Sequence, residues 1–275
     1  MELGEILKFH FVFDAFDICA KYDDVFSAIE AEILPNFREI GEKFSFGGEY
    51  EKELKQALMK FARSDRKKIG VAKILPRFTA QKITQILLEA GFLNLEKSHE
   101  KRPVKLHKND KLPRILRRYQ ITDKVHFNDN FSRFWFRFIE PNLQILAQGE
   151  YEKVIGEIRE DFDNYASFGY EILCRELLAN YLNIDISQIS SYWDKNSEID
   201  IFAKFEGFLV VGECKYKERK ISKNVLNELL AKCENSALAP DMVALFSKSG
   251  FSGELEKIKN DRILLFDIED FKILL

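Results

Sequence analysis

Residues 197–217, SEIDIFAKFEGFLVVGECKYK, decide how the C-terminal part of this chain folds, because they predict a β-hairpin. The segment EIDIFAKF favours a first strand, and Glu206-Gly207 supplies the residue types of a tight turn. The segment FLVVGECKYK follows as a second strand, and its nearly continuous apolar start is typical of a buried strand. The stretch therefore predicts two antiparallel strands, of which the second lies inside a sheet.

Three charged side chains of this hairpin form a candidate chemical site. Glu213 and Lys215 are two residues apart on one strand, so both face the same way, and the turn brings Asp200 close to Glu213. Two carboxylates suit Mg²⁺ or Mn²⁺, which polarises a phosphodiester and acidifies a water, while an ammonium steadies the developing negative charge. The hairpin therefore predicts Asp200 and Glu213 as metal ligands, with Lys215 beside the attacking water.

Two further acids are candidates for the same site. Glu171 lies on a helix predicted before the hairpin, and Glu198 precedes Asp200 by two residues on the same strand. A plainer interpretation makes Glu213 and Lys215 a solvent-facing pair at a strand end and Asp200 an exposed acid at the sheet edge. The apolar run ahead of them favours a metal site, because burying charges without a partner or a metal is costly.

The remainder of residues 161–275 predicts an α/β domain around the hairpin. Helices are expected at about 164–181 and 222–235, and the segments MVALFS and RILLFDI predict two more buried strands. This order of elements predicts a mixed sheet flanked by helices.

The net charge of −3 conceals an uneven distribution of charge along the chain. Residues 60–124 carry 18 Lys and Arg against six Asp and Glu, for a net charge of +12, whereas residues 1–59 carry −7 and residues 125–275 carry −8. Such a basic block favours a polyanionic partner, although a solvated basic face is the plainer alternative. The charge by itself does not distinguish DNA from RNA.

Residues 53–122 also have the order of elements of a winged helix. A helix, a short apolar segment and a helix at 79–90, with Thr79 as its N-cap, precede strand-like FLNLE, a basic loop and strand-like RRYQIT. The third helix of such a module enters the major groove, and its wing lies along phosphates. A winged helix that binds protein is the alternative, but so many like charges would cost a protein interface stability. The module is assigned to residues 53–126, and its predicted DNA-binding residues are Lys82, Gln85, Lys101, Arg102, Lys105, Lys108, Arg114, Arg117 and Arg118.

Two other regions complete the predicted domain organisation. Residues 1–52 predict an acidic helical region that packs on the next part of the chain or on a partner. Residues 127–160 predict linking helices, in which four aromatic residues repeat at helical spacing. That repeat favours a buried helix over a base-stacking platform. The aromatic residues are Phe131, Phe134, Trp135 and Phe138.

The sequence also argues against several classes of protein. No apolar run approaches the roughly 20 residues of a membrane span, and the N-terminus lacks the pattern of a signal peptide. The four cysteines and four histidines lack the spacing of zinc or disulfide sites. We therefore expect a cytoplasmic protein with reduced thiols and no membrane contact. A homodimer is compatible with phosphodiester hydrolysis at the candidate site, because two-fold symmetric nucleases cut both strands of a duplex as dimers.

The spacing of Glu171, Asp200 and Glu213-Cys214-Lys215 resembles the PD-(D/E)xK superfamily, which implies a restriction-endonuclease-like core. Ile199 stands where that motif has proline. Residues from about 70 to 275 further resemble the C-terminal domain of unknown function attached to archaeal-type DEXX-box ATPases. The stretches that carry this second resemblance are RRYQITD, FSRFWFRFIEPN, the SEIDI–GECKY hairpin and ALFSKSGFSGEL.

The ATPase half of those relatives has no counterpart here, because the sequence contains no phosphate-binding G-x-x-x-x-G-K-[ST] motif. Three hypotheses follow: a Mg²⁺-dependent DNA nuclease, a non-catalytic DNA-binding regulator that keeps the nuclease fold, and a subunit whose acidic helices dock on a separately encoded P-loop ATPase. In each case the expected fold is α/β (α+β overall), with an N-terminal helical and winged-helix region followed by a restriction-endonuclease-like mixed sheet flanked by helices.

Overall fold

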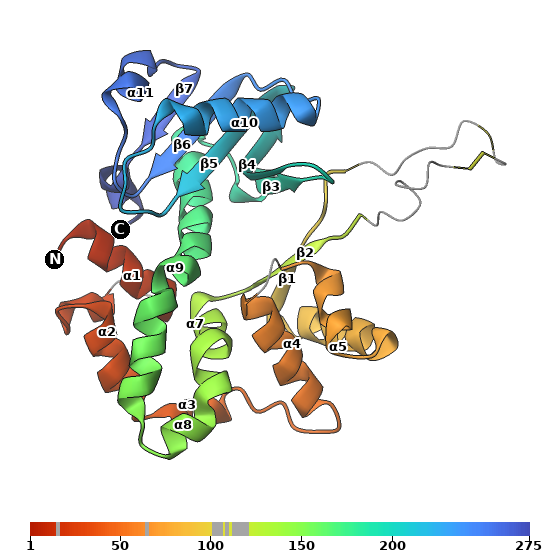
Figure 1. Ribbon diagram of the computed structural model, residues 1–275, viewed down its shortest axis with the longest axis vertical. Coiled ribbons are helices and arrows are strands. Elements are labelled where there is room, and N and C mark those ends of the chain that lie inside the picture. Colours follow the sequence, from red (N-terminus) through yellow and green to blue (C-terminus); the bar gives the residue numbers. More distant parts are fainter. Residues whose placement is uncertain (15–16, 64–65, 101–106, 108–109, 112–120) are drawn as a thin grey trace. The chain divides into compact units, whose positions relative to one another are not determined.

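The computed structural model describes residues 1–14, 17–63, 66–100, 107, 110–111 and 121–275 (Figure 1). The chain divides into two compact units. The first unit contains residues 1–96, 124–170 and 275, and the second contains residues 97–123 and 171–274. The candidate chemical residues from the predicted hairpin all lie in the second unit.

A five-stranded mixed sheet forms the centre of the second unit, which confirms the predicted fold class. The strand order is β3-β4-β5-β6-β7; the first three strands are antiparallel neighbours and the last three are parallel neighbours. The strands are β3 (Ile189–Trp193), β4 (Glu198–Phe205), β5 (Phe208–Lys215), β6 (Met242–Ser247) and β7 (Ile263–Phe266).

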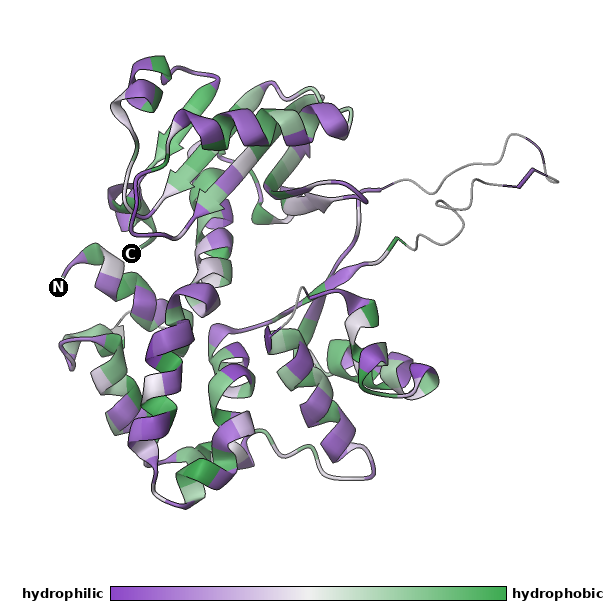
Figure 2. Cartoon of the chain, viewed as in Figure 1, coloured by the Kyte–Doolittle hydropathy of each residue, from purple (hydrophilic) through white to green (hydrophobic). Residues whose placement is uncertain are grey.

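Helices cover both faces of this sheet. Leu226, Leu229 and Cys233 of α10 (Lys223–Asn235) pack with strand residues in one apolar cluster, and Figure 1 shows α10 lying across that face. On the other face the ring of Phe266 meets Tyr181 of the helix α9 (Tyr151–Leu182). Because β5 is buried on both faces, it reads as an apolar run, and Figure 2 shows the central strands in the green of hydrophobic residues. The connection from β6 to β7 contains α11 (Gly253–Ile258), and η7 (Ile268–Leu274) follows β7.

The predicted hairpin is confirmed residue for residue at its turn. Glu206 and Gly207 have φ values of 50° and 84°, and a two-residue turn with both φ values positive matches the twist of the strands it joins. The strands pair from Phe205 opposite Phe208 to Ile201 opposite Gly212. The next residues along this register are Asp200 and Glu213, so the turn itself brings the two acids together.

The first unit begins with short helices that follow one another closely. Their inward residues are apolar, as the prediction of a helical N-terminal region requires, and Leu7, Phe9, Phe11 and Val12 are fully buried. The elements are α1 (Leu3–Phe13), η1 (Asp17–Ala20), α2 (Val25–Ala28), η2 (Ile29–Ile33) and α3 (Phe37–Glu42).

The aromatic segment of the first unit is a core element. Phe134 and Trp135 are 0% exposed, and the Trp135 ring stacks on Phe44 with centroids 4.9 Å apart. Their burial confirms the predicted buried helix and leaves these rings no face on which a base could stack. The segment comprises α7 (Asn130–Phe134), η4 (Trp135–Ile139), η5 (Glu140–Asn142) and α8 (Leu143–Ala147).

One prediction in this region is wrong. The last of the linking helices predicted within 127–160 and the separate helix expected at about 164–181 are a single helix, α9 (Tyr151–Leu182), of 32 residues. No proline interrupts residues 151–182, and both glycines within them, Gly156 and Gly169, adopt helical geometry. The acidic stretch at 160–163 therefore stays helical and does not form a linker.

In the region predicted to be a winged helix, the described residues form helical segments followed by a pair of strands, with two corrections to the prediction. The third helix begins at Arg77 after Pro76, so Thr79 lies inside it and is not an N-cap. The strand that pairs with β1 is β2; Ile121 and Thr122 of the predicted RRYQIT strand are not in a strand, and its residues 117–120 lie outside the described residues. Lys67 forms an isolated bridge with Lys124, which adds a short third partner to the strand pair. The elements are α4 (Glu51–Arg63), η3 (Lys68–Lys73), α5 (Arg77–Glu89), β1 (Leu93–Glu96) and β2 (Lys124–Phe127).

Candidate functional site

Asp200 lies in a bulge of β4. Between the pairs Ser190–Phe202 and Tyr192–Ile199, β4 has one more residue than β3. Ile199 and Phe202 both join the apolar cluster under α10, although regular alternation would place residues three apart on opposite faces. Such an insertion re-aims a side chain, and the Asp200 Oδ2 atom accepts a hydrogen bond from the Cys214 backbone N–H at 2.9 Å.

Glu213 lies near the end of β5 and is held by two lysines. Its Oε1 atom is 2.5 Å from Lys215 Nζ, and its Oε2 atom is 2.8 Å from Lys232 Nζ. The Glu213 side chain is only 9% exposed, whereas the two lysine side chains are about one third exposed. A buried carboxylate with two ammonium partners is well compensated, and the two contacts fix Glu213 in position.

Three carboxylates interact electrostatically at this end of the hairpin. Burial, followed by the negative charges of Glu171 and Glu213, raises the pKa of Asp200 to about 8. The Cys214 N–H and the Lys215 ammonium oppose that rise. Carboxylates that crowd one another in a poorly solvated position have perturbed pKa values, and such carboxylates are common in active sites.

Lys215 is suited to act as a cation and not as a base. Its burial alone would lower its pKa, but the neighbouring Glu213 and Asp200 carboxylates raise it above the usual value. A permanently protonated ammonium can donate to a phosphoryl oxygen or to a water, and it can stabilise negative charge.

On the opposite face of β5, the thiol of Cys214 contacts the thiol of Cys174 on α9 and anchors the site to that helix. Burial and a hydrogen bond with Cys174 raise the pKa of the Cys214 thiol well above its usual value. A protonated, fully buried thiol is a packing group and not a nucleophile. Cys174 is three residues after Glu171 on α9, so the contact holds Glu171 close enough to affect Asp200. Arg175 of the same helix donates to the Asp200 carbonyl oxygen at 3.3 Å.

The structure therefore brings together all four predicted catalytic residues: Glu171, Asp200, Glu213 and Lys215. The further candidate Glu198 is exposed at the start of β4, where it pairs with Trp193, on the other side of the bulge. Sequence reasoning missed Lys232, because it lies 19 positions after Glu213 on a different element. The signal available in the sequence was weak: a cation on α10 one residue before the buried Cys233.

Lys232 is expected to support the site through Glu213. We expect Lys232→Ala to lower any hydrolysis by about tenfold, because one of the two charges that position Glu213 is lost, while Lys232→Arg restores most of the rate. The measurement is the single-turnover rate of each variant, with exposed Lys272→Ala as the control. Equal rates for Lys232→Ala and Lys272→Ala would show that Lys232 contributes nothing to the chemistry.

The donor chemistry of the site fits Mg²⁺ or Mn²⁺. Within the described part of the chain, no three His, Cys, Asp or Glu side chains stand close enough to enclose a metal ion. Mg²⁺, however, is commonly bound through one or two carboxylates, with waters and substrate phosphate completing its shell. A divalent ion would also relieve the repulsion that raises the pKa of Asp200. Asp200 and Glu213 would hold such an ion, and Glu213 would exchange a lysine contact for it.

The predicted DNA-binding residues are placed only in part. Lys82 and Gln85 are exposed on α5, where Lys82 contacts the ring of Tyr50 and Gln85 donates to Glu89. Phe78, at the start of the same helix, is 85% exposed, and an exposed aromatic side chain favours the alternative of a protein partner. The other predicted residues lie outside the described residues: Lys101, Arg102, Lys105, Lys108, Arg114, Arg117 and Arg118.

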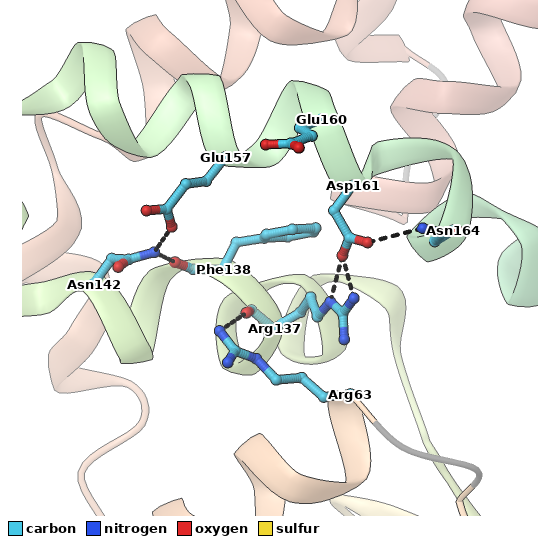
Figure 3. Close-up of a pocket in the computed structure, with 8 residues that line it drawn as sticks. All are labelled: Arg63, Arg137, Phe138, Asn142, Glu157, Glu160, Asp161 and Asn164. Atoms are coloured by element: carbon cyan, nitrogen blue, oxygen red, sulfur yellow. Dashed lines mark hydrogen bonds and ion pairs between the residues drawn. The ribbon is translucent and has the colours of Figure 1, made fainter.

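A polar hollow of about 470 Å³ in the first unit is a separate feature (Figure 3). Arg137 forms an ion pair with Asp161, and Arg63 donates to the Arg137 carbonyl oxygen at 3.2 Å. Asn142 donates to both Glu157 and Phe138, each at 3.0 Å. These polar groups satisfy one another across helices, so we assign the hollow a role in packing and no chemistry.

The site lies within the part of the chain that resembles known proteins. Residues 135–228 match the model of the DUF234 family, described as "Archaea bacterial proteins of unknown function". An uncharacterized protein of Methanocaldococcus jannaschii is 30% identical over 174 residues, which cover 57% of this chain. The match spans only 38% of that relative's length. The family match includes the four catalytic candidates and ends before Lys232.

No helix among the described residues is both long and apolar enough to cross a membrane.

Proposed function

We propose that this chain binds DNA and hydrolyses phosphodiester bonds in a metal-dependent reaction. The observation that supports this most strongly is the arrangement at the hairpin end, where Asp200 and Glu213 meet beside Lys215 and close to Glu171. Its residue types and order along the chain resemble the PD-(D/E)xK pattern. The proposal includes the restriction-endonuclease-like identity of the core and a link to DEXX-box ATPases.

Each residue has a distinct role in the proposed reaction. Asp200 and Glu213 would hold Mg²⁺ or Mn²⁺, whose positive charge would polarise the phosphodiester and acidify a water. Lys215 orients the attacking water and donates to the phosphoryl group as negative charge develops. The water gives up a proton to solvent as its oxygen bonds to phosphorus, the bond from phosphorus to the leaving sugar oxygen breaks, and that oxygen takes up a proton from solvent. Glu171 keeps the pocket negative, which favours capture of the cation.

The winged-helix region supplies the grip on DNA in this proposal. Its third helix α5 presents Lys82 and Gln85 to solvent, as a helix that enters the major groove must. The surrounding 60–124 segment carries the net charge of +12 that attraction to phosphates requires. A homodimer would let two such sites cut both strands, and a cytoplasmic location fits a DNA substrate.

The proposal is tested by offering labelled duplex DNA, single-stranded DNA and RNA to the purified chain with Mg²⁺, Mn²⁺ or EDTA. We expect cleavage of DNA with either ion and none with EDTA. Lys215→Ala should lower the rate by about 10²-fold or more while binding persists. Cleavage that continues in EDTA would contradict the metal-dependent reaction.

A second function is favoured by one feature of the same site. Both carboxylate oxygens of Glu213 already have lysine partners, so its charge is compensated without an ion. A DNA-binding regulator, or a subunit of a P-loop ATPase that keeps the nuclease fold as a scaffold, would show this arrangement. Salt-sensitive DNA binding that does not respond to divalent ions, without cleavage, is the result that would favour this second function.

A further inference from the structure

A groove of about 430 Å³ opens next to Lys215, where β5 ends and the chain runs to α10. Most of its lining is basic or can donate hydrogen bonds, and one carboxylate, Glu228, also borders it. We call this feature the basic groove, and its polar donors are Lys215, Lys217, Arg219, Lys220, Ser222 and Asn224.

The cations of the basic groove are available to a ligand. Lys217, Arg219 and Lys220 are exposed, and within the described residues no ion pair engages their charged groups. The nearby Glu218 does not neutralise them, because it pairs with Lys248. Lys215 is paired with Glu213, so the excess positive charge comes from Lys217, Arg219 and Lys220, which stand against the single carboxylate of Glu228 and favour an anion.

The start of α10 adds to this preference. The helix has 13 residues, and its N-cap, Ser222, makes no side-chain capping hydrogen bond. Backbone N–H groups in a first turn lack partners within the helix, and the helix dipole places partial positive charge there. The Ser222 hydroxyl and these N–H groups therefore favour an anionic ligand, as the neighbouring cations do.

We infer that the basic groove binds the phosphates of a nucleic-acid backbone that flank the phosphodiester cut beside Lys215. This inference rests on the proposed function, and it places the substrate strand along the basic groove. The row of cations begins at the candidate catalytic ammonium and continues along the chain from Lys217 to Lys220. One free phosphate would engage only part of such a row, whereas a backbone with repeated phosphates engages all of it.

The test compares two triple variants of the full chain that remove the same charges. The groove variant is Lys217→Ala, Arg219→Ala and Lys220→Ala; the control variant is Lys257→Ala, Lys259→Ala and Arg262→Ala, three exposed cations of the same unit. Affinity for a short labelled duplex is measured by fluorescence anisotropy across a salt series without divalent ions. We expect the groove variant to bind at least about tenfold more weakly, with a salt slope reduced by about 2 to 3, since each lost phosphate contact removes about 0.9.

Two results would overturn the inference. One is a groove variant whose affinity and salt slope equal those of the control variant. The other is a free-phosphate site. In that case inorganic phosphate binds the wild type but not the groove variant, and the two chains bind the duplex with equal affinity. Because binding is measured without metal, a loss of affinity in the groove variant alone supports the phosphate contacts whether or not any chain cuts DNA, so failure of the hydrolysis and failure of the groove are separate results.

Discussion

Glu213→Gln is expected to lower metal-dependent cleavage by about 10³-fold or more. Glu213 is the most tightly held acid of the site, with Lys215 at 2.5 Å and Lys232 at 2.8 Å from its two oxygens. The amide keeps the shape but removes the charge that would bind the cation and fix both ammonium groups. The single-turnover rate with Mg²⁺ in excess measures the loss.

Two other glutamates separate this effect from a general change of charge. Glu234→Gln removes an exposed charge of α10, two residues after Lys232, and should leave the rate unchanged. Glu198→Gln tests the further candidate acid, which lies beyond the bulge and should also have little effect. A Glu213→Gln chain that cuts at the wild-type rate would remove Glu213 from the site.

Asp200→Asn is expected to stabilise the folded chain in mildly alkaline solution. The folded pKa of Asp200 is about 8, against 3.8 for the ordinary side chain, so the folded state holds a proton that the unfolded state releases. The contribution of Asp200 to the free energy of unfolding of the wild type is therefore fully present below about pH 4, and it is lost as the pH rises toward 8. The amide cannot ionise and can still accept from Cys214, so above pH 8 we expect a gain of about 2–5 kcal/mol.

Urea unfolding at several pH values measures this gain. At pH 4 the two chains should have similar free energies of unfolding, because Asp200 is protonated in the folded wild type there. Added Mg²⁺ should raise the stability of the wild type and not that of Asp200→Asn, since ligand that binds only the folded state stabilises it. A constant difference between the chains from pH 4 to pH 9 would show that the carboxylates do not crowd Asp200.

Much of the site could be predicted from the sequence because it is local. The turn at Glu206-Gly207 fixes the register of β4 and β5, and that register sets Asp200 beside Glu213. Alternation then gives Glu213 and Lys215 the same face, and their 2.5 Å contact agrees with that expectation. These relations depend on neighbouring residues in one hairpin, which patterns of residue type can describe.

The features that the sequence could not provide depend on contacts between distant elements. Lys232 reaches Glu213 only because α10 packs across β5, and the bulge at Asp200 appears only when β4 pairs with β3, a strand that was not predicted. The long helix α9 was divided wrongly because the acids Glu160, Asp161 and Asp163 resemble a linker, although helix continuity is decided by the packing on either side.

The most direct test of the central claim is nicking of supercoiled plasmid with Mn²⁺ by wild type and Asp200→Ala, purified in parallel so that any contaminating nuclease acts equally in both. We expect the wild type to nick and linearise the plasmid and EDTA to stop it. We also expect Asp200→Ala to be inactive while it still binds DNA in a gel shift. Equal cutting by both chains, or no cutting by the wild type with either Mg²⁺ or Mn²⁺, would contradict a hydrolytic site at Asp200.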